Sequence, residues 1–375
     1  MGDPPAKTAI VTGANAGIGR EVAQGLVARG WRVILACRDT RAAGRAAEDI
    51  AREAPGGAVE VGPALDLADN GSVRNFVKGI GDRPVHLLVN NAAVNFVPKW
   101  HTEDGVAGMV QVNYLGPYLL TRLLAPSLRA CAPSRVVHVS SVMHRLTHMP
   151  RPAAFLSTWS PSCYANTKLA NILFANEFHR REGPLGVHSC AVDPGGVRTR
   201  IYAGSIYARP PLSWAVDLLF APPSDGAQAV LHAATCDWPP TIGRDSLEHG
   251  PGTRSERREL LQILRKGQSP VGQSGSRRGS ASNGFSFYAR GLFASPLVTR
   301  WGGGGEGWQG AAWGAVYALV LALHAAMDYP IRRMSGGRWG GGTRAVPAAP
   351  QAGDARLALE LWNSSAEIVG LPRHS

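Results

Sequence analysis

Short apolar runs alternate with longer stretches of helical periodicity through the first two thirds of the chain. The runs are four to six residues long and rich in valine, isoleucine and leucine, and they cover residues 8–11, 32–36, 85–89, 135–139 and 187–192. Continuous short runs of this kind are typical of strands buried on both faces of a parallel sheet. A further strand is expected to begin near residues 59–61. The pattern predicts an α/β fold with a doubly wound parallel sheet.

The junction after the first strand has the composition of a phosphate-binding turn. Thr12-Gly13-Ala14-Asn15-Ala16-Gly17-Ile18-Gly19 follows residues 8–11 directly and opens a helical pattern. Glycines at such a junction let the backbone approach a pyrophosphate, and the positive end of the helix then faces the phosphates. The Gly-x3-Gly-x-Gly spacing differs from the Gly-x-Gly-x2-Gly of other dinucleotide folds. The junction predicts dinucleotide binding on a Rossmann-type sheet.

A tyrosine and a lysine stand four residues apart in Tyr164-Ala165-Asn166-Thr167-Lys168. On a helix these two side chains project from the same face, one turn apart. A free phenol has a pKa of about 10, and a nearby ammonium favours the phenolate and lowers that pKa. The pair therefore predicts a general acid/base, while the spacing alone leaves open a solvated helix face.

Several segments, in this order, resemble the short-chain dehydrogenase/reductase family. They are the glycine turn, the Asn-Asn-Ala-Ala run at 90–93, Val112-Asn113, Ser140-Ser141, Tyr164-x3-Lys168 and Pro194-Gly195-x-Val197-x-Thr199. The resemblance covers roughly residues 7–236, and the sequences around Asn113 and Tyr164 are most similar to the retinol-dehydrogenase-like branch. Two positions depart from the family: Ala93 replaces a glycine, and Asp193 stands where related members often carry histidine. The resemblance implies an NAD(P)-dependent oxidoreductase acting on CH–OH or C=O groups.

The resemblance also implies a role for each of four catalytic residues. Tyr164 would transfer the proton, and Ser141 would hydrogen-bond the substrate oxygen and stabilise its developing charge. Lys168 would lower the pKa of Tyr164 and bind the nicotinamide ribose. Asn113 would hold a water beside the lysine and so extend the proton relay. For Asn113 an alternative stays open, in which a buried amide satisfies irregular backbone.

The residue after the second strand bears on the choice of cofactor. In such folds this position meets the adenosine ribose, where arginine suits the 2′-phosphate of NADP and a carboxylate suits NAD. Arg38 comes first, so NADP(H) is preferred, and Asp39 keeps NAD open. The expected cofactor-binding residues are Gly13, Asn15, Gly17, Ile18, Gly19, Arg38, Asp66, Leu67, Asn90, Ala92, Tyr164, Lys168, Pro194, Gly195, Val197 and Thr199.

The 22 residues between Ser141 and Tyr164 are unusually apolar and aromatic for a connection. A long connection of this kind predicts a substrate-covering loop and a lipophilic substrate, such as a retinal-like molecule or another aldehyde or ketone. His144 and His148 are four apart within it, as zinc ligands can be. No third ligand is apparent in the sequence, so no metal site is expected.

Composition and charge bear on location and partners. Five scattered cysteines without a Cys-x-x-Cys pair indicate a reducing compartment. Residues 1–7 contain no apolar segment, which predicts no signal peptide and a cytoplasmic location. More than half of the net charge of +12 falls in residues 239–375, whose biased composition favours a solvated segment over nucleic-acid binding. Peripheral membrane association and homo-oligomerisation stay open.

The last third of the chain predicts low-complexity insertions into a single domain. The expected core spans 1–238, followed by a flexible insertion at 239–283 and a last strand with its flank at 284–300. A glycine-rich insertion at 301–354 contains an apolar stretch at 311–327, expected to be a docked or interfacial helix. Residues 355–375 are expected to be a closing helix and tail. These insertions motivate an alternative function, an NADP(H)-sensing scaffold that binds a partner.

Overall fold

One sheet runs through the protein, with its first strand in the interior. The structure is a computed structural model that describes residues 6–147, 149, 151–157, 160, 162–205, 208–210, 212–237, 287–289, 344–346 and 348–373. Within these residues eight strands pair in the order β3-β2-β1-β4-β5-β6-β7-β8. Strands β1 to β7 are parallel, and β8 is antiparallel to β7. The strands are β1 Thr8–Thr12, β2 Arg32–Ala36, β3 Ala58–Val61, β4 Leu87–Asn90, β5 Ser134–Val139, β6 Val187–Asp193, β7 Phe287–Ala289 and β8 Arg344–Val346.

The side chains of the apolar strands pack into two separate cores, one on each face of the sheet. Successive side chains of a strand point to opposite faces. Ile10, Leu88 and Val136 therefore pack into one core, whereas Val11 and Val89 pack into the other. All five side chains are fully buried. This double burial is why the runs read as continuously apolar, and it confirms the doubly wound Rossmann-type fold that the sequence predicts.

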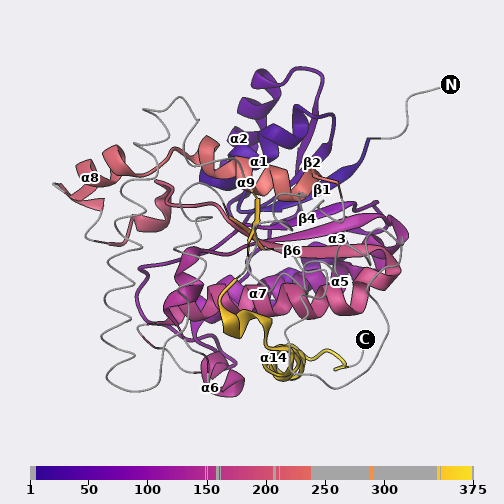
Figure 1. Ribbon diagram of the computed structural model, residues 1–375. Coiled ribbons are helices and arrows are strands. Elements are labelled where there is room, and N and C mark those ends of the chain that lie inside the picture. The colour runs from indigo at the N-terminus through magenta and orange to yellow at the C-terminus, as the bar shows by residue number, and fades with distance from the viewer. Residues whose placement is uncertain are drawn as a thin grey trace, which may run out of the picture.

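Helices cover both faces of this sheet (Figure 1). One face carries α1 Gly17–Val27, α2 Thr40–Glu53 and α9 Pro223–Thr235. The other carries α3 Asn70–Ile80, α5 Gly116–Ala130 and α7 Cys163–Glu182. A short helix α4 (Gly108–Val110) and a π-helical turn η1 (Gln111–Leu115) lead into α5, and η3 (Gly183–Leu185) follows α7. Asp39 and Asp69 begin α2 and α3 by accepting backbone hydrogen bonds, as N-cap residues do.

Helix α7 is buried on nearly all sides because a C-terminal segment covers its outer surface. The 3₁₀ turn η7 (Pro350–Gly353) and helix α14 (Ala355–Ile368) pack against it. The Trp362 side chain of α14 is 1% exposed, and the Tyr118 hydroxyl donates to the Trp362 carbonyl at 3.1 Å. The guanidinium groups of Arg122 and Arg181 each lie 4.3 Å from the Trp362 ring. Helix α7, which carries the tyrosine–lysine pair, is therefore packed between the sheet on one side and α14 with η7 on the other.

The connection between Ser141 and Tyr164 packs in part into the core. It contains the 3₁₀ turn η2 (Val142–Leu146) and helix α6 (Pro152–Ser157), and α6 contacts α14. Met149, Phe155 and Leu156 are buried in the core on the α7 side of the sheet. These three side chains therefore serve core packing, whereas Met143 in the same segment is 37% exposed. A substrate-covering role for the rest of the connection stays a prediction.

Helix α8 (Leu212–Leu219) lies at the left of the view in Figure 1. The 3₁₀ turn η4 (Arg200–Tyr202) precedes it in the chain. Within the described part of the chain, no helix combines the length and apolar character required to cross a bilayer. The apolar stretch predicted at 311–327, and most of the insertions around it, lie outside the described residues.

Candidate active site

The glycine turn between β1 and α1 forms one wall of a pocket at the carboxyl edge of the sheet. Gly13 and Gly17 have φ values of +65° and +57°, a region that favours glycine. A Cβ atom on Gly19 would lie 2.5 Å from the Gly13 carbonyl oxygen. The N-cap position of α1, Ala16, supplies no side-chain hydrogen bond, so the first N–H groups of α1 keep their capacity to bind an anion.

The turn is tied to the end of β4 by the Thr12 side chain. Thr12 Oγ1 accepts hydrogen bonds from the backbone N–H groups of Asn91 and Ala92, at 2.9 and 3.0 Å. Asn91 Nδ2 donates to the Thr12 carbonyl at 2.9 Å. These bonds fix the floor of a pocket of about 480 Å³. A pocket of this size, with a glycine turn that leaves no room for side chains, fits a dinucleotide.

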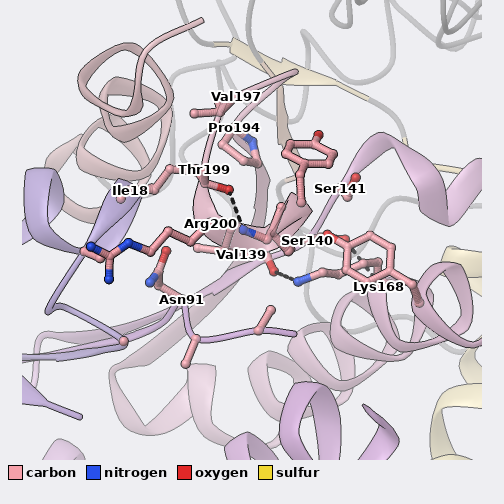
Figure 2. Close-up of a pocket in the computed structure, with 18 of the residues that line it drawn as sticks. Ile18, Asn91, Val139, Ser140, Ser141, Lys168, Pro194, Val197, Thr199 and Arg200 are labelled. Carbon is pink, nitrogen blue, oxygen red and sulfur yellow. Dashed lines mark hydrogen bonds between the residues drawn. The ribbon is translucent and has the colours of Figure 1, made fainter. Parts of the chain in front are cut away.

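Ser141, Tyr164 and Lys168 line the same pocket as the glycine turn (Figure 2). Ser141 follows β5, and the other two residues lie on the first turns of α7. The Lys168 ammonium donates to the Val139 carbonyl at 2.9 Å and lies 5.4 Å from the centre of the Tyr164 ring. Ser140 Oγ donates to the Lys168 carbonyl at 2.8 Å and so anchors α7 to the end of β5. The structure thus brings together three of the four residues predicted to be catalytic.

Burial controls the proton affinities of this pair. Loss of water raises the pKa of Tyr164; the nearby Tyr202 and Asp193 raise it further, and a hydrogen bond from Ser141 acts in the opposite direction. Burial also lowers the pKa of Lys168 to about 8, although the charge of Asp193 partly counteracts it. Desolvation is the largest cause, so the pKa of Tyr164 is raised overall, and the prediction that Lys168 lowers it stays a prediction.

Asn113 lies beneath the pocket, in the π-helical turn η1. Its Oδ1 accepts from the Val94 N–H at 2.8 Å, and its Nδ2 donates to the Val94 carbonyl at 2.9 Å and to Thr167 Oγ1 at 3.3 Å. The amide thus satisfies the backbone of the segment after β4 and links it to α7. This is the alternative that the sequence left open for Asn113, and the relay role stays a prediction.

Of the residues expected around the adenosine, Arg38 lines the pocket, whereas Asp66 and Leu67 do not. Arg38 lines it, with a side chain 78% exposed and its guanidinium 3.9 Å from the Asp66 carboxylate. The Asp39 carboxylate instead accepts from the Ala42 N–H and caps α2. Leu67 is buried in the core, and its carbonyl lies close to Gly116. Neither Asp66 nor Leu67 is among the residues that line the pocket.

Of the remaining expected residues, most line the pocket and two do not. Gly13, Asn15, Gly17, Ile18, Ala92, Pro194, Gly195, Val197 and Thr199 do. Gly19 lies behind the turn, and the Asn90 side chain points into the core, where its Nδ2 donates to Thr121 Oγ1 at 2.9 Å. The neighbouring Asn91 lines the pocket instead, which the sequence did not single out.

Three lining residues without a predicted role, Arg200, Ile201 and Tyr202, form η4 directly after Thr199. Their position after the Pro-Gly-x-Val-x-Thr segment is the one signal that could have found them. The loop after β6 therefore lines the pocket through η4 as well as through the Pro-Gly-x-Val-x-Thr segment. In the described part of the expected substrate cover, which follows Ser141 and ends before Tyr164, no residue is among those that line the pocket.

His144, considered as a zinc ligand, has a structural role. It is fully buried, with Nδ1 2.6 Å from the Ser141 carbonyl, and Nε2 accepts from the Ala349 N–H at 3.1 Å. Burial lowers its pKa to about 3, so the ring is neutral and both nitrogens are engaged. His148 lies outside the described residues. Among the residues described, no group of three metal-binding side chains gathers.

Comparisons with known proteins agree with this geometry. The family model for short chain dehydrogenases matches residues 7–207. Retinol dehydrogenase 11 from Homo sapiens is 39% identical over 236 residues, which cover 61% of this chain and 73% of that protein. An uncharacterised protein from Mycobacterium paratuberculosis has a similar structure, with a TM-score of 0.60, 26% identity, and coverage of 98% of this chain and 96% of that one.

A second solved structure holds a nicotinamide cofactor. It is described as an NAD(P)-dependent gluconate 5-dehydrogenase from Beutenbergia cavernae, with NADP bound at low occupancy. It has a TM-score of 0.50 and 26% identity, and the match covers 62% of this chain and 90% of that one. Together with the glycine turn and the Ser141, Tyr164 and Lys168 cluster, these matches place the chain in the short-chain dehydrogenase family, as an NAD(P)-dependent oxidoreductase acting on CH–OH and C=O groups.

Proposed function

We propose that the protein is an NADP(H)-dependent oxidoreductase that interconverts a lipophilic carbonyl compound and its alcohol. The observation that carries the proposal is that Ser141, Tyr164 and Lys168 share one pocket with the glycine turn. A scaffold that only senses the cofactor would not require a proton donor and an oxygen-binding hydroxyl at that place. The shared pocket therefore favours catalysis over the scaffold alternative.

The proposed proton donor and acceptor is Tyr164. Its raised pKa keeps the phenol protonated at neutral pH, so it is ready to protonate the oxygen of a carbonyl substrate. Ser141 would donate a hydrogen bond to the same oxygen and stabilise its developing negative charge. The positive charge of Lys168, one helical turn away, would stabilise the phenolate that remains. NADPH would supply the hydride when bound.

The binding residues proposed for the cofactor follow the length of the pocket. The N–H groups of the glycine turn and of the first turn of α1 would hold the phosphates. Lys168 would contact the nicotinamide ribose, and Pro194, Gly195, Val197 and Thr199 would border the nicotinamide. The Asn113 side chain is already hydrogen-bonded to Val94 and Thr167. We therefore propose that the backbone of Asn113, in the π-helical turn, holds the water that extends the proton relay beside Lys168.

NADPH is the proposed cofactor rather than NADH. Arg38 reaches the pocket, and its guanidinium can pair with a 2′-phosphate. Asp39, the residue that would favour NADH, is committed to the N-cap of α2. The Asp39 carboxylate is therefore less able to accept hydrogen bonds from a free ribose 2′-hydroxyl.

A lipophilic aldehyde or ketone is the proposed substrate class. Retinol dehydrogenase 11 is a relative at 39% identity. Ile201 and Tyr202 line the pocket, and the Tyr202 ring lies near the rings of Phe96 and Phe220, with centroids 6.2 and 5.7 Å away. These apolar groups suit an extended hydrocarbon. Cytoplasmic location, peripheral membrane association and homo-oligomerisation stay predictions.

Removing the Tyr164 hydroxyl tests the catalytic assignment. Purified protein with NADPH and a panel of lipophilic aldehydes and ketones should show turnover. Tyr164→Phe should lower kcat by roughly 100-fold or more, because a positioned general acid contributes about 10² to 10⁴. Tyr202→Phe removes a hydroxyl from the same pocket and should change kcat by only a few-fold. Equal losses in the two variants would remove Tyr164 from the proposed mechanism.

Reversing the charge of Arg38 tests the cofactor choice. Arg38→Asp should raise the KM for NADPH by roughly 10-fold or more and leave that for NADH unchanged or lower, because a charged hydrogen bond is lost and a carboxylate is gained. Arg41→Asp is the matched control on the exposed start of α2 and should have little effect. An unchanged ratio of kcat/KM for NADPH over NADH would show that Arg38 does not select the cofactor.

A further inference from the structure

Arg200 is a cation in the pocket that neither the predicted mechanism nor the cofactor motif uses. It is the first residue of η4 and lines the same pocket as Gly13, Gly17 and Lys168. Figure 2 shows its side chain extending past Ile18 on the side of the pocket that carries Asn91. The guanidinium therefore lies on the side of the glycine turn, away from the Ser141 end of the pocket.

The backbone that carries Arg200 is fixed against the glycine turn. A Cβ atom on Gly17 would contact the Thr199 methyl group at 3.6 Å. Thr199 Oγ1 accepts from the Ile201 N–H at 3.4 Å, and the Arg198 N–H donates to the Ala221 carbonyl at 3.0 Å. The segment that contains Arg200 is thus held at the mouth of the turn.

Arg200 is exposed, and within the described residues its side chain has no hydrogen-bond or ion-pair partner. Arg198, two residues earlier, is different: its guanidinium lies 3.7 Å from the Asp217 carboxylate and 3.4 Å from the Asp217 carbonyl. One arginine of this segment therefore lies beside a carboxylate, whereas its neighbour lines the pocket without one among the described residues.

The charges along the pocket indicate the kind of ligand that Arg200 meets. The described lining contains the cations Arg38, Lys168 and Arg200 and no carboxylate side chain. Arg38 stands at the adenosine end and Lys168 beside Tyr164, so Arg200 is the cation that faces the turn between them. A guanidinium can form two parallel hydrogen bonds to phosphate oxygens.

We propose that Arg200 binds the diphosphate bridge of the dinucleotide, opposite the N–H groups of the glycine turn. The proposal rests on the proposed function, because it takes the ligand of the pocket to be NADP(H). The bridge would then be held from two sides, by backbone amides below and a guanidinium above. Arg200 would raise the affinity for NADPH and NADH alike, unlike Arg38, which would act on the 2′-phosphate.

Equilibrium binding to the whole protein tests the proposal. Dissociation constants for NADPH, NADH and ADP-ribose would be measured by fluorescence titration or calorimetry. Arg200→Ala should weaken all three roughly 10- to 100-fold, because each ligand contains the diphosphate. Arg200→Lys should recover part of the loss, since it keeps the charge without the paired geometry. Arg198→Ala, the matched control, should bind all three as the wild type does.

Four outcomes would overturn the proposal. Unchanged affinities in Arg200→Ala would show that the guanidinium contacts none of these ligands. A loss confined to NADPH would assign Arg200 to the 2′-phosphate, and an increase in the substrate KM without any change in cofactor affinity would assign it to an anionic substrate. A wild type that binds no dinucleotide would overturn the proposed function as well, whereas the other outcomes leave that function intact.

Discussion

Burial changes the proton affinities of Tyr164 and Lys168 in opposite directions. It raises the pKa of the phenol and lowers that of the ammonium to about 8, because each neutral form is favoured where water is excluded. Asp193, the last residue of β6, carries a negative charge that partly counteracts the lowering of the Lys168 pKa. The carboxylate at this position, where related proteins often carry histidine, therefore helps to keep Lys168 charged.

A pH dependence of cofactor use follows from Lys168. Because its pKa is lowered to about 8, the ammonium is present below that pH and is lost above it. The value of kcat/KM for NADPH, which reports ionisations of the free enzyme, should therefore fall above roughly pH 8. A profile that stays flat to about pH 9.5 would contradict this assignment.

Asp193→Asn provides a matched test of the same ionisation. The amide keeps an oxygen that can accept from the Gly195 N–H, as Asp193 Oδ1 does at 3.0 Å, but it removes the charge. The fall in kcat/KM should then begin at a lower pH than in the wild type. Arg198→Ala should leave the profile where it is.

Helix α14 is the element that holds the catalytic helix from outside. It packs along α7, and its Trp362 contacts Tyr118, Phe174 and two arginines. Tyr114 on η1 also hydrogen-bonds Ser365 of α14, with the two oxygens 3.0 Å apart. A segment distant in sequence therefore supports both α7 and the π-turn that carries Asn113.

Truncating Trp362 tests this support. Trp362→Ala should lower the free energy of unfolding by about 3–5 kcal/mol, because a fully buried indole is replaced by a cavity. Leu359→Ala on the exposed side of the same helix, where the side chain is 41% exposed, should change it by about 0.5 kcal/mol or less. Urea unfolding of both variants measures the difference. Similar small changes in the two would show that α14 does not stabilise the core.

Elements with a local signature could be predicted from the sequence. The glycine turn, the five apolar strands and the Tyr164–Lys168 spacing are each encoded within a few residues, and the structure places them in one sheet and one pocket. The burial of Phe155, the bonds of the Asn113 amide and the orientation of Arg200 depend on contacts between distant segments. Helix α14 turns an apolar connection into core, and no local pattern contains that information.

At the scale of the whole molecule, the residues that line the pocket lie together at one edge of the sheet. Parallel strands end on the same side, so β1, β4, β5 and β6 deliver the glycine turn, Asn91, Ser141 and Thr199 to a common place. Helix α7 adds Tyr164 and Lys168, and η4 contributes further lining residues to the same pocket. We therefore propose that this pocket transfers hydride between NADP(H) and a lipophilic substrate.

Isotope transfer tests that claim most directly. The protein would be incubated with NADPH deuterated at the reactive nicotinamide carbon and a lipophilic aldehyde such as retinal, and the alcohol would be analysed by mass spectrometry. We expect one deuterium in the product, and we expect Tyr164→Phe to form this product roughly 100-fold or more slowly. A wild type that binds the cofactor but yields no deuterated alcohol from any lipophilic aldehyde or ketone would contradict it.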